Sequence, residues 1–461
     1  MDVVELYNCL FNPEGVAVIG ASPKEGKMGR VVIENMVRAE FKGKIYPVNP
    51  KYEKILGLKT YKNVVEVPDP VDTAIIIIPA ISVPKVIEDC GKRGIRVAIV
   101  LSAGFSEAGR KDLELELLRN ARKYGIRIIG PNCAGVIIPS IGFHGSFESL
   151  MSAGRIAVIG QSGAYLTAMA AELERRGLGI SAFISYGNRV DLDEEILLRL
   201  LLMHEETKAI AFYVEGLRKG IGSKLLKTIR EVTKEKPLVI HKAGITSAGA
   251  RAVISHTGSL AGEYKIYEAA FRQSGAIIVN DIDLILDVSE ALSILPLPHP
   301  NSIPIVLTNS GGHGVTIADH LELLGVKVPE TPESVREILK KLLPPHAALN
   351  NPIDLLAEAS AEIYAKSVEV LLANEKVGVI VIVINPPPLV KAIDVCKAII
   401  DVWDQSGRSK PLVFFLAGFG IEDSMKYLRS VKAPVVTTHR GAAYVVKTLY
   451  DRSRYLREVV E

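Results

Sequence analysis

Several features that would place this sequence in a specialised class are missing or sparse. The chain has 461 residues but only four cysteines, Cys9, Cys90, Cys133 and Cys396, which are far apart and form no CxxC pair. This spacing favours reduced, cytosolic thiols over a disulfide framework. The net charge is only +3 and no run of Lys and Arg forms a basic arm, so no nucleic-acid partner is expected.

Long hydrophobic runs are also missing. The most apolar segments, 74–79 and 377–385, are far shorter than the ~20 residues that span a bilayer, so we predict buried strands and no membrane partner. The N-terminus, MDVVELYNCL, lacks the basic and long apolar segments of a signal peptide. We therefore expect a cytoplasmic protein. Glutamine occurs only at 161, 273 and 405 while Lys and Glu are abundant, a weak indication of a thermophilic source.

The pattern that is present is one of repeated strand-to-helix turns. An apolar run, a Gly/Ser turn and a helical stretch follow one another at 16–22, 155–163 and 303–312. Strand-like and helical stretches alternate between these starts, which predicts parallel sheets with helices on both faces. Internal duplication and the ordinary strand–helix alternation of α/β proteins explain these three strand–turn–helix segments equally well.

We predict an α/β protein of three doubly wound domains, with a Rossmann-like domain followed by two flavodoxin-like ones. The proline-rich LPLPHP at 295–300 is typical of a linker, and 142–154 forms a softer boundary. The predicted domains are therefore 1–147, 148–297 and 298–461.

The first turn predicts a phosphate site. VAVIGASPKEGKMG at 16–29 puts a Gly-rich turn between a strand and a helix, whose first backbone N–H groups can bind phosphate. A dinucleotide fingerprint would need Gly at Ser22 and an acidic residue at the end of the next strand. That strand ends instead in Asn49 and Lys51, so NAD is disfavoured.

These residues fit a phosphorylated nucleotide such as coenzyme A (CoA) better. Lys27 and Lys51 supply cations, and later strand ends would line the crevice at the carboxyl edge of the sheet. Cys133, at one of these ends, is either a buried small side chain or a neighbour of the CoA thiol. The predicted CoA-binding residues are Gly20, Ala21, Ser22, Lys27, Asn49, Lys51, Pro79, Ser102, Ala103, Gly104, Asn132 and Cys133.

The segments VAVIGAS, NPK, IIPA, SAGFSE and GPNCAG resemble the CoA-binding domain of succinyl-CoA synthetase alpha chains and their relatives. The resemblance implies that CoA lies over Ser22, Lys51, Pro79 and 102–104. It also implies that the thiol is directed toward the second domain.

A histidine in a glycine-rich segment is the candidate for covalent chemistry. AVISHTGSLAGEYKIYEAAFRQSG at 252–275 predicts His256 in a loop, followed by a helix that begins near Gly262. No apolar periodicity would bury His256, and small neighbours leave room for a ligand and for movement. A lone histidine is more often a packed or surface residue, so the hypothesis depends on anion sites elsewhere in the chain.

Two further turns predict such sites. IGQSGAYLTA at 159–168 and TNSGGHGVTIADHL at 308–321 each join a strand to a helix N-terminus, where amides and the helix dipole favour phosphate. Two such helix ends converging on a phosphorylated histidine would offset much of its charge. We assign His313 to the second phosphate loop at most, and predict no metal site because HExxH and Cys/His quartets are missing. The predicted phosphate-binding residues are Gln161, Ser162, Gly163, Ala164, Asn309, Ser310, Gly311 and Gly312.

The imidazole of His256 must be neutral to attack phosphorus, and an ordinary histidine pKa of ~6.5 leaves it mostly so at neutral pH. Its second nitrogen needs an acceptor that fixes the tautomer. Glu215, at the end of the strand-like AIAFYVE, is the candidate, and a solvated strand-end carboxylate is the open alternative.

GQSGA, YVEGL and SHTGSLAG resemble the phosphate loop, the histidine-orienting glutamate and the phosphohistidine loop of the succinyl-CoA synthetase superfamily. That match implies that Glu215 and His256 carry the chemistry. A third domain with NSGGHG is fused to the first two, which resembles the alpha subunits of ADP-forming acetyl-CoA synthetases, a family of NDP-forming acyl-CoA synthetases. The resemblance covers essentially the whole sequence.

The resemblance implies that acyl-CoA and phosphate give CoA and a bound acyl phosphate, and that His256 then passes the phosphoryl group to ADP or GDP. The Mg-nucleotide would bind an ATP-grasp beta subunit in an α2β2 assembly, because no ATP-grasp domain or GxxxxGK(S/T) run is found here. Open alternatives are a CoA-sensing scaffold, a CoA-dependent acyltransferase and, least favoured, an NAD-dependent enzyme. The acyl group, which 185–193 could contact, stays open among acetyl, branched-chain, aryl and succinyl.

Overall fold

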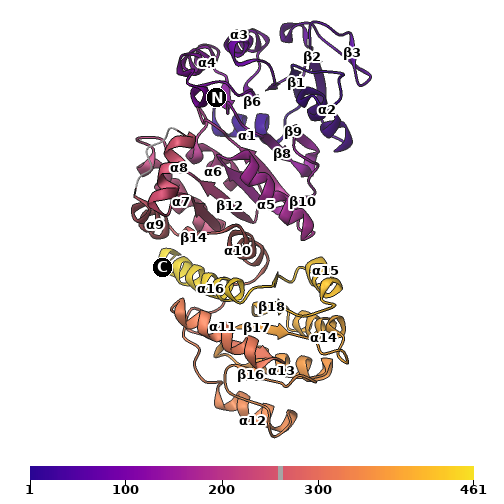
Figure 1. Ribbon diagram of the computed structural model, residues 1–461, viewed down its shortest axis with the longest axis vertical. Helices are drawn as coiled ribbons and strands as arrows, with labels where there is room; N and C mark the ends of the chain where they lie inside the picture. Colours follow the sequence, from indigo (N-terminus) through magenta and orange to yellow (C-terminus); the bar gives the residue numbers. More distant parts are fainter. Residues whose placement is uncertain (258–262, 461) are drawn as a thin grey trace. The chain divides into compact units, whose positions relative to one another are not determined.

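The structure, a computed structural model, describes residues 1–257 and 263–460, with the backbone alone described at 254–257 and 460. The chain divides into two compact units, Met1–Asn280 and Asp281–Glu461. Two mainly parallel sheets lie in the first unit and one lies in the second (Figure 1), which confirms the predicted α/β class. None of the described helices combines the length and apolar character that crossing a bilayer requires.

The first sheet has the strand order β2-β1-β5-β6-β7, and its neighbouring strands are parallel. The chain runs from β1 to β2 on one side and then continues with β5 on the other, so the topological switch point lies between β1 and β5. The elements are α1 (Val3–Phe11), β1 (Gly15–Ile19), α2 (Met28–Arg38), β2 (Lys44–Val48), a β3 (Lys54–Ile55) and β4 (Leu58–Lys59) hairpin, β5 (Thr73–Ile76), α3 (Val83–Arg93), β6 (Val97–Val100), α4 (Lys111–Tyr124) and β7 (Arg127–Ile129).

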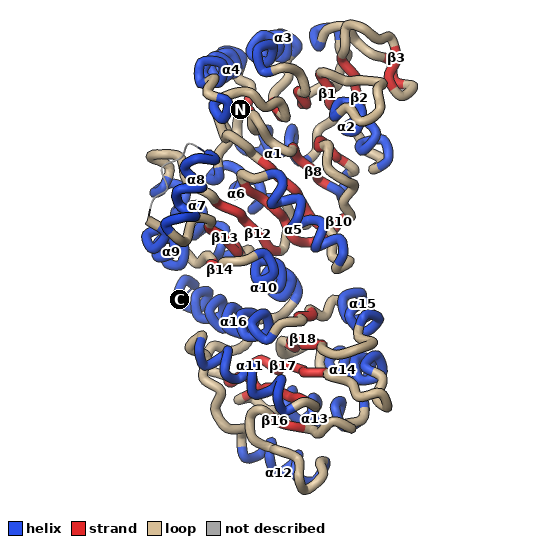
Figure 2. The backbone as a smooth tube through the Cα atoms, viewed as in Figure 1, coloured by secondary structure: helices blue, strands red, loops and turns tan. Residues whose placement is uncertain are grey.

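Alternate residues of the first sheet face two different cores. Val16 and Val18 pack in a cluster with residues of α1 and α2, whereas Ala17 and Ile19 pack with residues of α3 and α4. The sheet is therefore covered by helices on both faces (Figure 2), which explains why its strands are continuous apolar runs rather than alternating ones.

The second sheet has seven strands in the order β14-β13-β12-β10-β11-β8-β9. Its five parallel strands repeat the order of the first sheet, and β8 and β9 add an antiparallel pair beside β11. The elements are β8 (Gly135–Ile138), β9 (Phe143–Ser146), β10 (Ala153–Gly160), α5 (Gly163–Arg175), β11 (Ile180–Ser185), α6 (Glu194–Met203), β12 (Ala209–Val214), α7 (Gly222–Glu235), β13 (Leu238–Lys242), α8 (Ser247–Thr257), α9 (Tyr264–Gln273) and β14 (Ile277–Val279).

The segment 142–154, for which the sequence indicates only a soft boundary, contains strand β9. All four residues of β9 are buried, and the strand pairs with β8 over its whole length. The segment after the first sheet therefore adds strands β8 and β9 to the second sheet. It does so before β10, the first parallel strand of that sheet, begins. The domain limits at 147/148 and 297/298 stay predictions.

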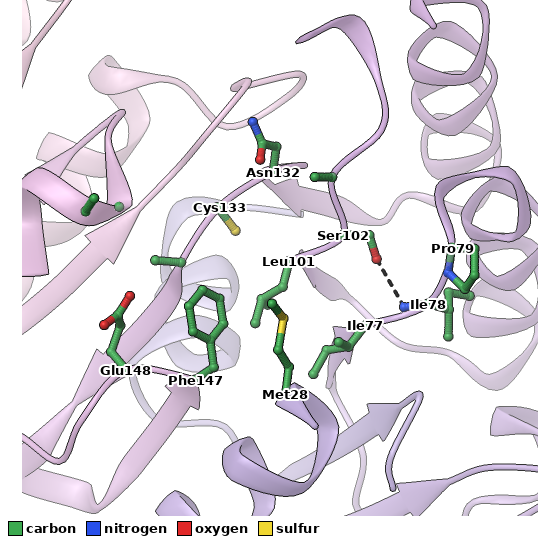
Figure 3. A pocket seen from close by; sticks show the side chains of 14 residues that line it. Met28, Ile77, Ile78, Pro79, Leu101, Ser102, Asn132, Cys133, Phe147 and Glu148 are labelled. Atoms are coloured by element: carbon green, nitrogen blue, oxygen red, sulfur yellow. Dashed lines mark hydrogen bonds between the residues drawn. The ribbon is translucent and has the colours of Figure 1, made fainter. Parts of the chain in front are cut away.

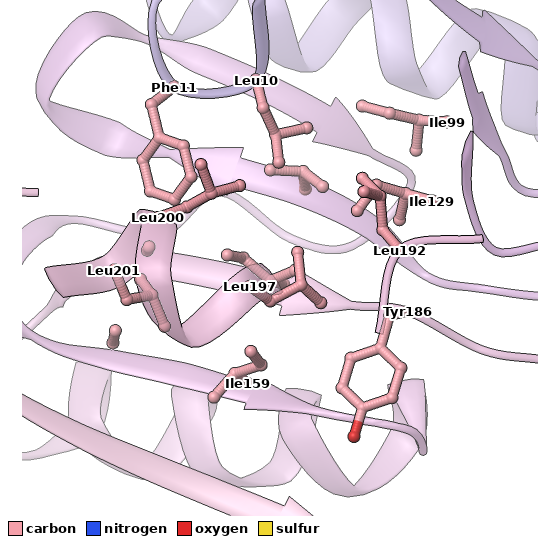
Figure 4. Packing of buried hydrophobic residues seen from close by; sticks show 14 of the residues in the cluster. Leu10, Phe11, Ile99, Ile129, Ile159, Tyr186, Leu192, Leu197, Leu200 and Leu201 are labelled. Atoms are coloured by element: carbon pink, nitrogen blue, oxygen red, sulfur yellow. The ribbon is translucent and has the colours of Figure 1, made fainter. Parts of the chain in front are cut away.

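The two sheets of the first unit share one hydrophobic core. Leu10 and Phe11 of α1 and Ile99 of β6 belong to the same cluster as Leu197 and Leu200 of α6 (Figure 4). Burial of apolar side chains is the main favourable term in folding. The second sheet is therefore held against the first by the same interaction that stabilises each of them.

The third sheet, in the second unit, has the order β16-β15-β17-β18-β19 and is parallel throughout. This is the strand order of the first sheet once more. The elements are α10 (Ile282–Ile294), β15 (Ile303–Thr308), α11 (Gly311–Leu323), α12 (Glu333–Leu342), β16 (Ile353–Asp354), α13 (Ala361–Ala373), β17 (Val377–Ile384), α14 (Ala392–Gln405), β18 (Leu412–Leu416), α15 (Glu422–Ser430), β19 (Val435–Val436) and α16 (His439–Val460).

Leu197→Ala is expected to lower the free energy of unfolding by about 2–5 kcal/mol, because it leaves a cavity in the shared core where Leu197 is fully buried. Leu115→Ala is the matched control, since Leu115 lies on α4 with 58% of its surface exposed; its effect should stay within about 0.5 kcal/mol. Denaturant unfolding followed by circular dichroism measures both. Equal effects of the two variants would contradict a core that the sheets share.

Candidate functional site

A cavity of about 560 Å³ lies in the first unit (Figure 3). One wall is formed by residues that follow β5, β6 and β7, where the carboxyl ends of parallel strands meet at one edge of the sheet. The opposite wall contains Phe147 and Glu148 after β9, and Gly163 and Ala164 at the start of α5. The cavity therefore joins two residue sets that the sequence assigns to different ligands. From the predicted CoA set it is lined by Pro79, Ser102, Ala103, Asn132 and Cys133, and from the predicted phosphate set by Gly163 and Ala164.

Ser102 fixes the strand ends that form the first wall. Its hydroxyl accepts a hydrogen bond from the backbone N–H of Ile78 at 3.1 Å, drawn as a dashed line in Figure 3, and donates to the carbonyl of Ile76 at 3.4 Å. The segment after β6 continues through Ala103 to Gly104, and Gly104 has φ +107°, a conformation that favours glycine.

The remaining predicted CoA residues surround the turn after β1. Gly20 and Asn49 line a second, smaller cavity of about 200 Å³. The Asn49 side chain donates to the carbonyl of Ala21 at 2.7 Å and accepts from the backbone N–H of Lys51 at 2.9 Å, so it joins the ends of β1 and β2. The Ser22 hydroxyl accepts from the N–H of Lys24. Lys27 precedes α2 as its N-cap residue, and both Lys27 and Lys51 are exposed.

Cys133 is buried, as one of its two interpretations predicts, and it also forms part of the cavity wall. Its thiol donates to the carbonyl of Val100 at 3.3 Å. Burial raises the pKa of this thiol to about 12. Cys133 therefore contributes a neutral surface to the cavity and is not an activated nucleophile.

Helix α5 begins directly after the turn at 160–162, as the sequence predicts, and its first residues line the cavity. Ser162 is its N-cap, with a hydroxyl that accepts from the backbone N–H of Tyr165 at 3.4 Å. A Cβ at Gly163 would lie 2.7 Å from the Cβ of Ala134, which is closer than two carbons can approach, so this contact requires glycine. The backbone N–H groups of the first helical turn have no partner within a helix, and they can bind an anion here.

Phe147 and Glu148 line the cavity but are not among the predicted site residues. The backbone of this segment is held by the buried Asn35 of α2, whose amide donates to the carbonyls of Ser146 at 3.1 Å and Glu148 at 2.7 Å. Burial raises the pKa of the Glu148 carboxyl, and a hydrogen bond with Thr167 of α5 opposes that shift. No sequence signal identifies these residues, because contact with the cavity comes from the antiparallel β8–β9 pair.

Glu215 follows strand β12 and is buried, which removes the solvated alternative. The side chain of Gln161 holds the backbone at this point. Its oxygen accepts from the N–H groups of Glu215 at 2.7 Å and Gly216 at 3.2 Å, and its nitrogen donates to the carbonyl of Gly216 at 3.1 Å. Gln161 therefore ties the turn before α5 to the turn that carries Glu215.

Two buried cations complete this region, and sequence reasoning missed the role of both. Lys242 donates to the carbonyl of Glu215 at 2.8 Å, and its ammonium lies 4.8 Å from the ring centroid of Tyr267. Burial lowers the pKa of Lys242 to about 8, while Glu215 acts in the opposite direction. Arg189 lies within the segment 185–193, which is a candidate for acyl-group contacts; it donates to the carbonyl of Gly216 and pairs with Glu194 at 2.6 Å.

The prediction that position 256 lies in a loop is wrong for the backbone. Helix α8 spans Ser247–Thr257 and includes this position, because the alanine-rich SAGARAV continues the helix further than the glycines suggest. The side chain of His256 lies outside the described residues, as do 258–262. The next helix, α9, begins at Tyr264, close to the predicted start near Gly262.

The second predicted phosphate loop lies in the other unit, between β15 and α11. Asn309 bridges to Asn385, donating to its carbonyl at 3.0 Å and accepting from its N–H at 2.9 Å. Ser310 is the N-cap position, and Gly311 and Gly312 form the exposed start of α11.

His313, in the first turn of α11, pairs with an unpredicted histidine. Its Nδ1 lies 2.8 Å from Nε2 of His439, the first residue of α16, and both rings pack on Phe415. Burial lowers the pKa of His439, with smaller contributions from His313 and His320. Within residues 1–257 and 263–460, no group of three or more His, Cys, Asp or Glu could hold a metal ion.

At pH 8, Cys133 in the folded protein is expected to resist iodoacetamide, because a pKa of about 12 leaves on the order of one thiolate in ten thousand. Mass spectrometry of the Cys133 peptide after timed labelling measures this. The same protein in guanidinium is the control, where the thiol should label at the rate of a free cysteine. Equally fast labelling of the folded chain would show that the thiol is ionised or open to solvent.

Three family models match successive parts of the chain. They are described as CoA binding domain at residues 14–139, Succinyl-CoA ligase like flavodoxin domain at 153–292, and Ligase-CoA domain at 304–457. Together they cover most of the sequence in the order that the motifs predict.

The chain is also similar to named proteins over nearly its whole length. It is 38% identical to the alpha subunit of acetate–CoA ligase (ADP-forming) II of Pyrococcus furiosus, covering 97% of this chain and 98% of that one. It is 39% identical to acetate–CoA ligase (ADP-forming) I of Archaeoglobus fulgidus over 92% of this chain, but spans only 60% of that longer relative.

A solved structure of "Ca. Korarchaeum cryptofilum dinucleotide forming Acetyl-coenzyme A synthetase 1 in complex with phosphate and ADP" matches with a TM-score of 0.94. The identity is 36%, and the match covers 98% of this chain and 99% of the other.

Proposed function

Since this chain belongs to the family of ADP-forming acetate–CoA ligases, which are acid–thiol ligases, we propose that it is the alpha subunit of an NDP-forming acyl-CoA synthetase. The overall reaction would convert acyl-CoA, phosphate and ADP or GDP to the free acid, CoA and ATP or GTP. The observation that carries the proposal is the single cavity that joins predicted CoA-binding residues to the N-terminus of α5.

CoA is the proposed ligand of the first wall. Pro79, Ser102 and Asn132 line the cavity at the strand ends, and Gly20 and Asn49 line the neighbouring smaller one, so a long, phosphorylated ligand can extend across both. The thiol end would then face Phe147 and the start of α5. The CoA binding domain match at residues 14–139 supports this assignment.

Acyl phosphate formation is the proposed first step. Inorganic phosphate would bind at the amides of Gly163 and Ala164, where the helix dipole favours an anion. One phosphate oxygen attacks the thioester carbon, a C–O bond forms, and the C–S bond breaks to release CoA as the thiolate, which takes up a proton. The mainly apolar lining of the cavity strengthens the electrostatic stabilisation of this step.

His256 is the proposed acceptor in the second step. A neutral imidazole nitrogen attacks the phosphorus of the acyl phosphate, the P–O bond to the acyl group breaks, and the carboxylate leaves. We assign to the Glu215 carboxylate the role of accepting a hydrogen bond from the other imidazole nitrogen. The role of His256 depends on the match of SHTGSLAG to the family, and the assignment of Glu215 is supported by its burial and by the contacts of Gln161 and Lys242 with its backbone.

The nucleotide site is proposed to lie on a separate ATP-grasp beta subunit that binds Mg-nucleotide, in an α2β2 assembly in the cytoplasm. The Pyrococcus furiosus relatives are named as alpha subunits, and the Archaeoglobus fulgidus relative is a longer chain of which this one spans 60%. Convergence of the α5 and α11 N-termini on one phosphoryl group also stays a prediction.

His256→Ala is expected to abolish phosphoenzyme formation, because it removes the nitrogen that would carry the phosphoryl group. Incubation with radiolabelled phosphate and acetyl-CoA, followed by gel autoradiography, should give an acid-labile label on the wild-type chain. His346→Ala, at an exposed histidine, is the matched control and should label normally. A wild-type chain that binds acyl-CoA but never labels would instead support a CoA-sensing scaffold.

CoA binding is expected with a dissociation constant at least about tenfold lower than that of NAD, because Ser22 and Lys51 replace the glycine and the acidic residue that a dinucleotide site needs. Calorimetric titration of the chain alone with each compound measures the difference. Tighter binding of NAD would contradict the assignment of the first sheet to CoA.

A further inference from the structure

One strongly acidic or basic side chain lines the 560 Å³ cavity among the residues that the structure describes. Among the described residues that line it, Glu148 is the only Asp, Glu, Lys, Arg or His, and the others are apolar or uncharged. The thiol of Cys133 is neutral, since burial raises its pKa to about 12. The electrostatic character of the cavity is therefore set by one carboxylate.

The position of this carboxylate is well defined. Asn35 of α2 holds the backbone on both sides of Phe147 through its hydrogen bonds to the carbonyls of Ser146 and Glu148. A hydrogen bond with Thr167, on the first turns of α5, holds the Glu148 carboxyl against this helix. Glu148 thus lies on the α5 side of the cavity, beside Phe147 and across from Ser102 and Pro79 (Figure 3).

The acyl group must extend to this side of the cavity if the proposed function is correct. The thioester carbon has to lie between the CoA wall and a phosphate at Gly163 and Ala164, since those two groups react. The part of the acyl group beyond that carbon then passes along Phe147 and Glu148, which complete the wall next to α5.

We propose that Glu148 determines which acyl groups the enzyme accepts, admitting uncharged acyl groups of monocarboxylic acids and rejecting those that end in a second carboxylate. This inference rests on the proposed function. A terminal carboxylate would face a like charge in a partly enclosed space, where charges interact more strongly than in water. Specificity of this kind depends on a repulsive element as much as on attractive contacts.

The negative charge of Glu148 does not exclude inorganic phosphate, because the groups proposed to bind phosphate lie at the N-terminus of α5. The α5 N-terminus supplies backbone N–H groups and a dipole that favour an anion. A distal carboxylate has no comparable partner, since no Lys, Arg or His is found among the described residues that line the cavity. One cavity can therefore hold an inorganic anion at one end and exclude an organic one beside Phe147.

Glu148→Gln tests the inference because it keeps the shape of the side chain and removes its charge. Succinyl-CoA and butyryl-CoA are suitable probes, since both carry four-carbon acyl groups and differ in the terminal carboxylate. Calorimetric titration of the chain alone gives the dissociation constant of each. Wild type should bind butyryl-CoA at least about tenfold more tightly, and Glu148→Gln should reduce that ratio by about tenfold. Glu116→Gln, at an exposed position on α4, is the matched control and should leave the ratio unchanged.

The outcomes separate this inference from the proposed function. Wild type that binds both acyl-CoA compounds, with a ratio that Glu148→Gln does not change, overturns the role of Glu148 and leaves the synthetase proposal intact. Wild type that binds neither compound nor CoA overturns the proposed function itself. Glu148→Ala is the second variant if Glu148→Gln does not fold, and a circular dichroism spectrum unchanged from wild type shows that each variant is folded. A matching change in the ratio of kcat/KM values, measured with the beta subunit, supports the same conclusion.

Discussion

Helix α5 starts so close to the segment 131–134 that its first residue can have no side chain. Gly163 packs on Ala134, and the backbone N–H of Ala134 in turn donates to the hydroxyl of Ser185 at 3.0 Å. This contact places the amides of a helix N-terminus in the wall of a cavity whose other wall comes from a different sheet. A larger residue at 163 would push the helix away, and the two predicted ligand sites would no longer share one space.

Buried polar groups hold the second turn of the site, and each has a defined partner. Gln161 uses both ends of its amide on the backbone of Glu215 and Gly216, and Lys242 donates to the carbonyl of Glu215. Buried polar groups are costly when unsatisfied and rigid when satisfied. The network therefore fixes where the main chain at Glu215 lies.

Local pattern predicted the strands and the turns well, because each depends on a short run of sequence. The runs at 16–22, 155–163 and 303–312 all became a strand, a turn and a helix start, and the three sheets share one strand order. This order is common among doubly wound α/β folds, so duplication and the ordinary α/β pattern still explain it equally well. Partners that meet only in three dimensions were missed. Glu148 reaches the cavity through an antiparallel pair, Lys242 meets Glu215 across neighbouring strands, and His439 contacts His313 from a point 126 residues later. No periodicity or motif in the sequence indicates contacts of this kind.

Strands β8 and β9 belong to one half of the first unit by chain order and to the other half by hydrogen bonding. An evolutionary exchange of the CoA-binding half at residue 147 would carry these two strands away from the sheet that they complete, exposing the unpaired edge of β11. Exposed edges promote aggregation. The first two sheets are therefore one structural block, which a break in the chain at residue 147 would disrupt.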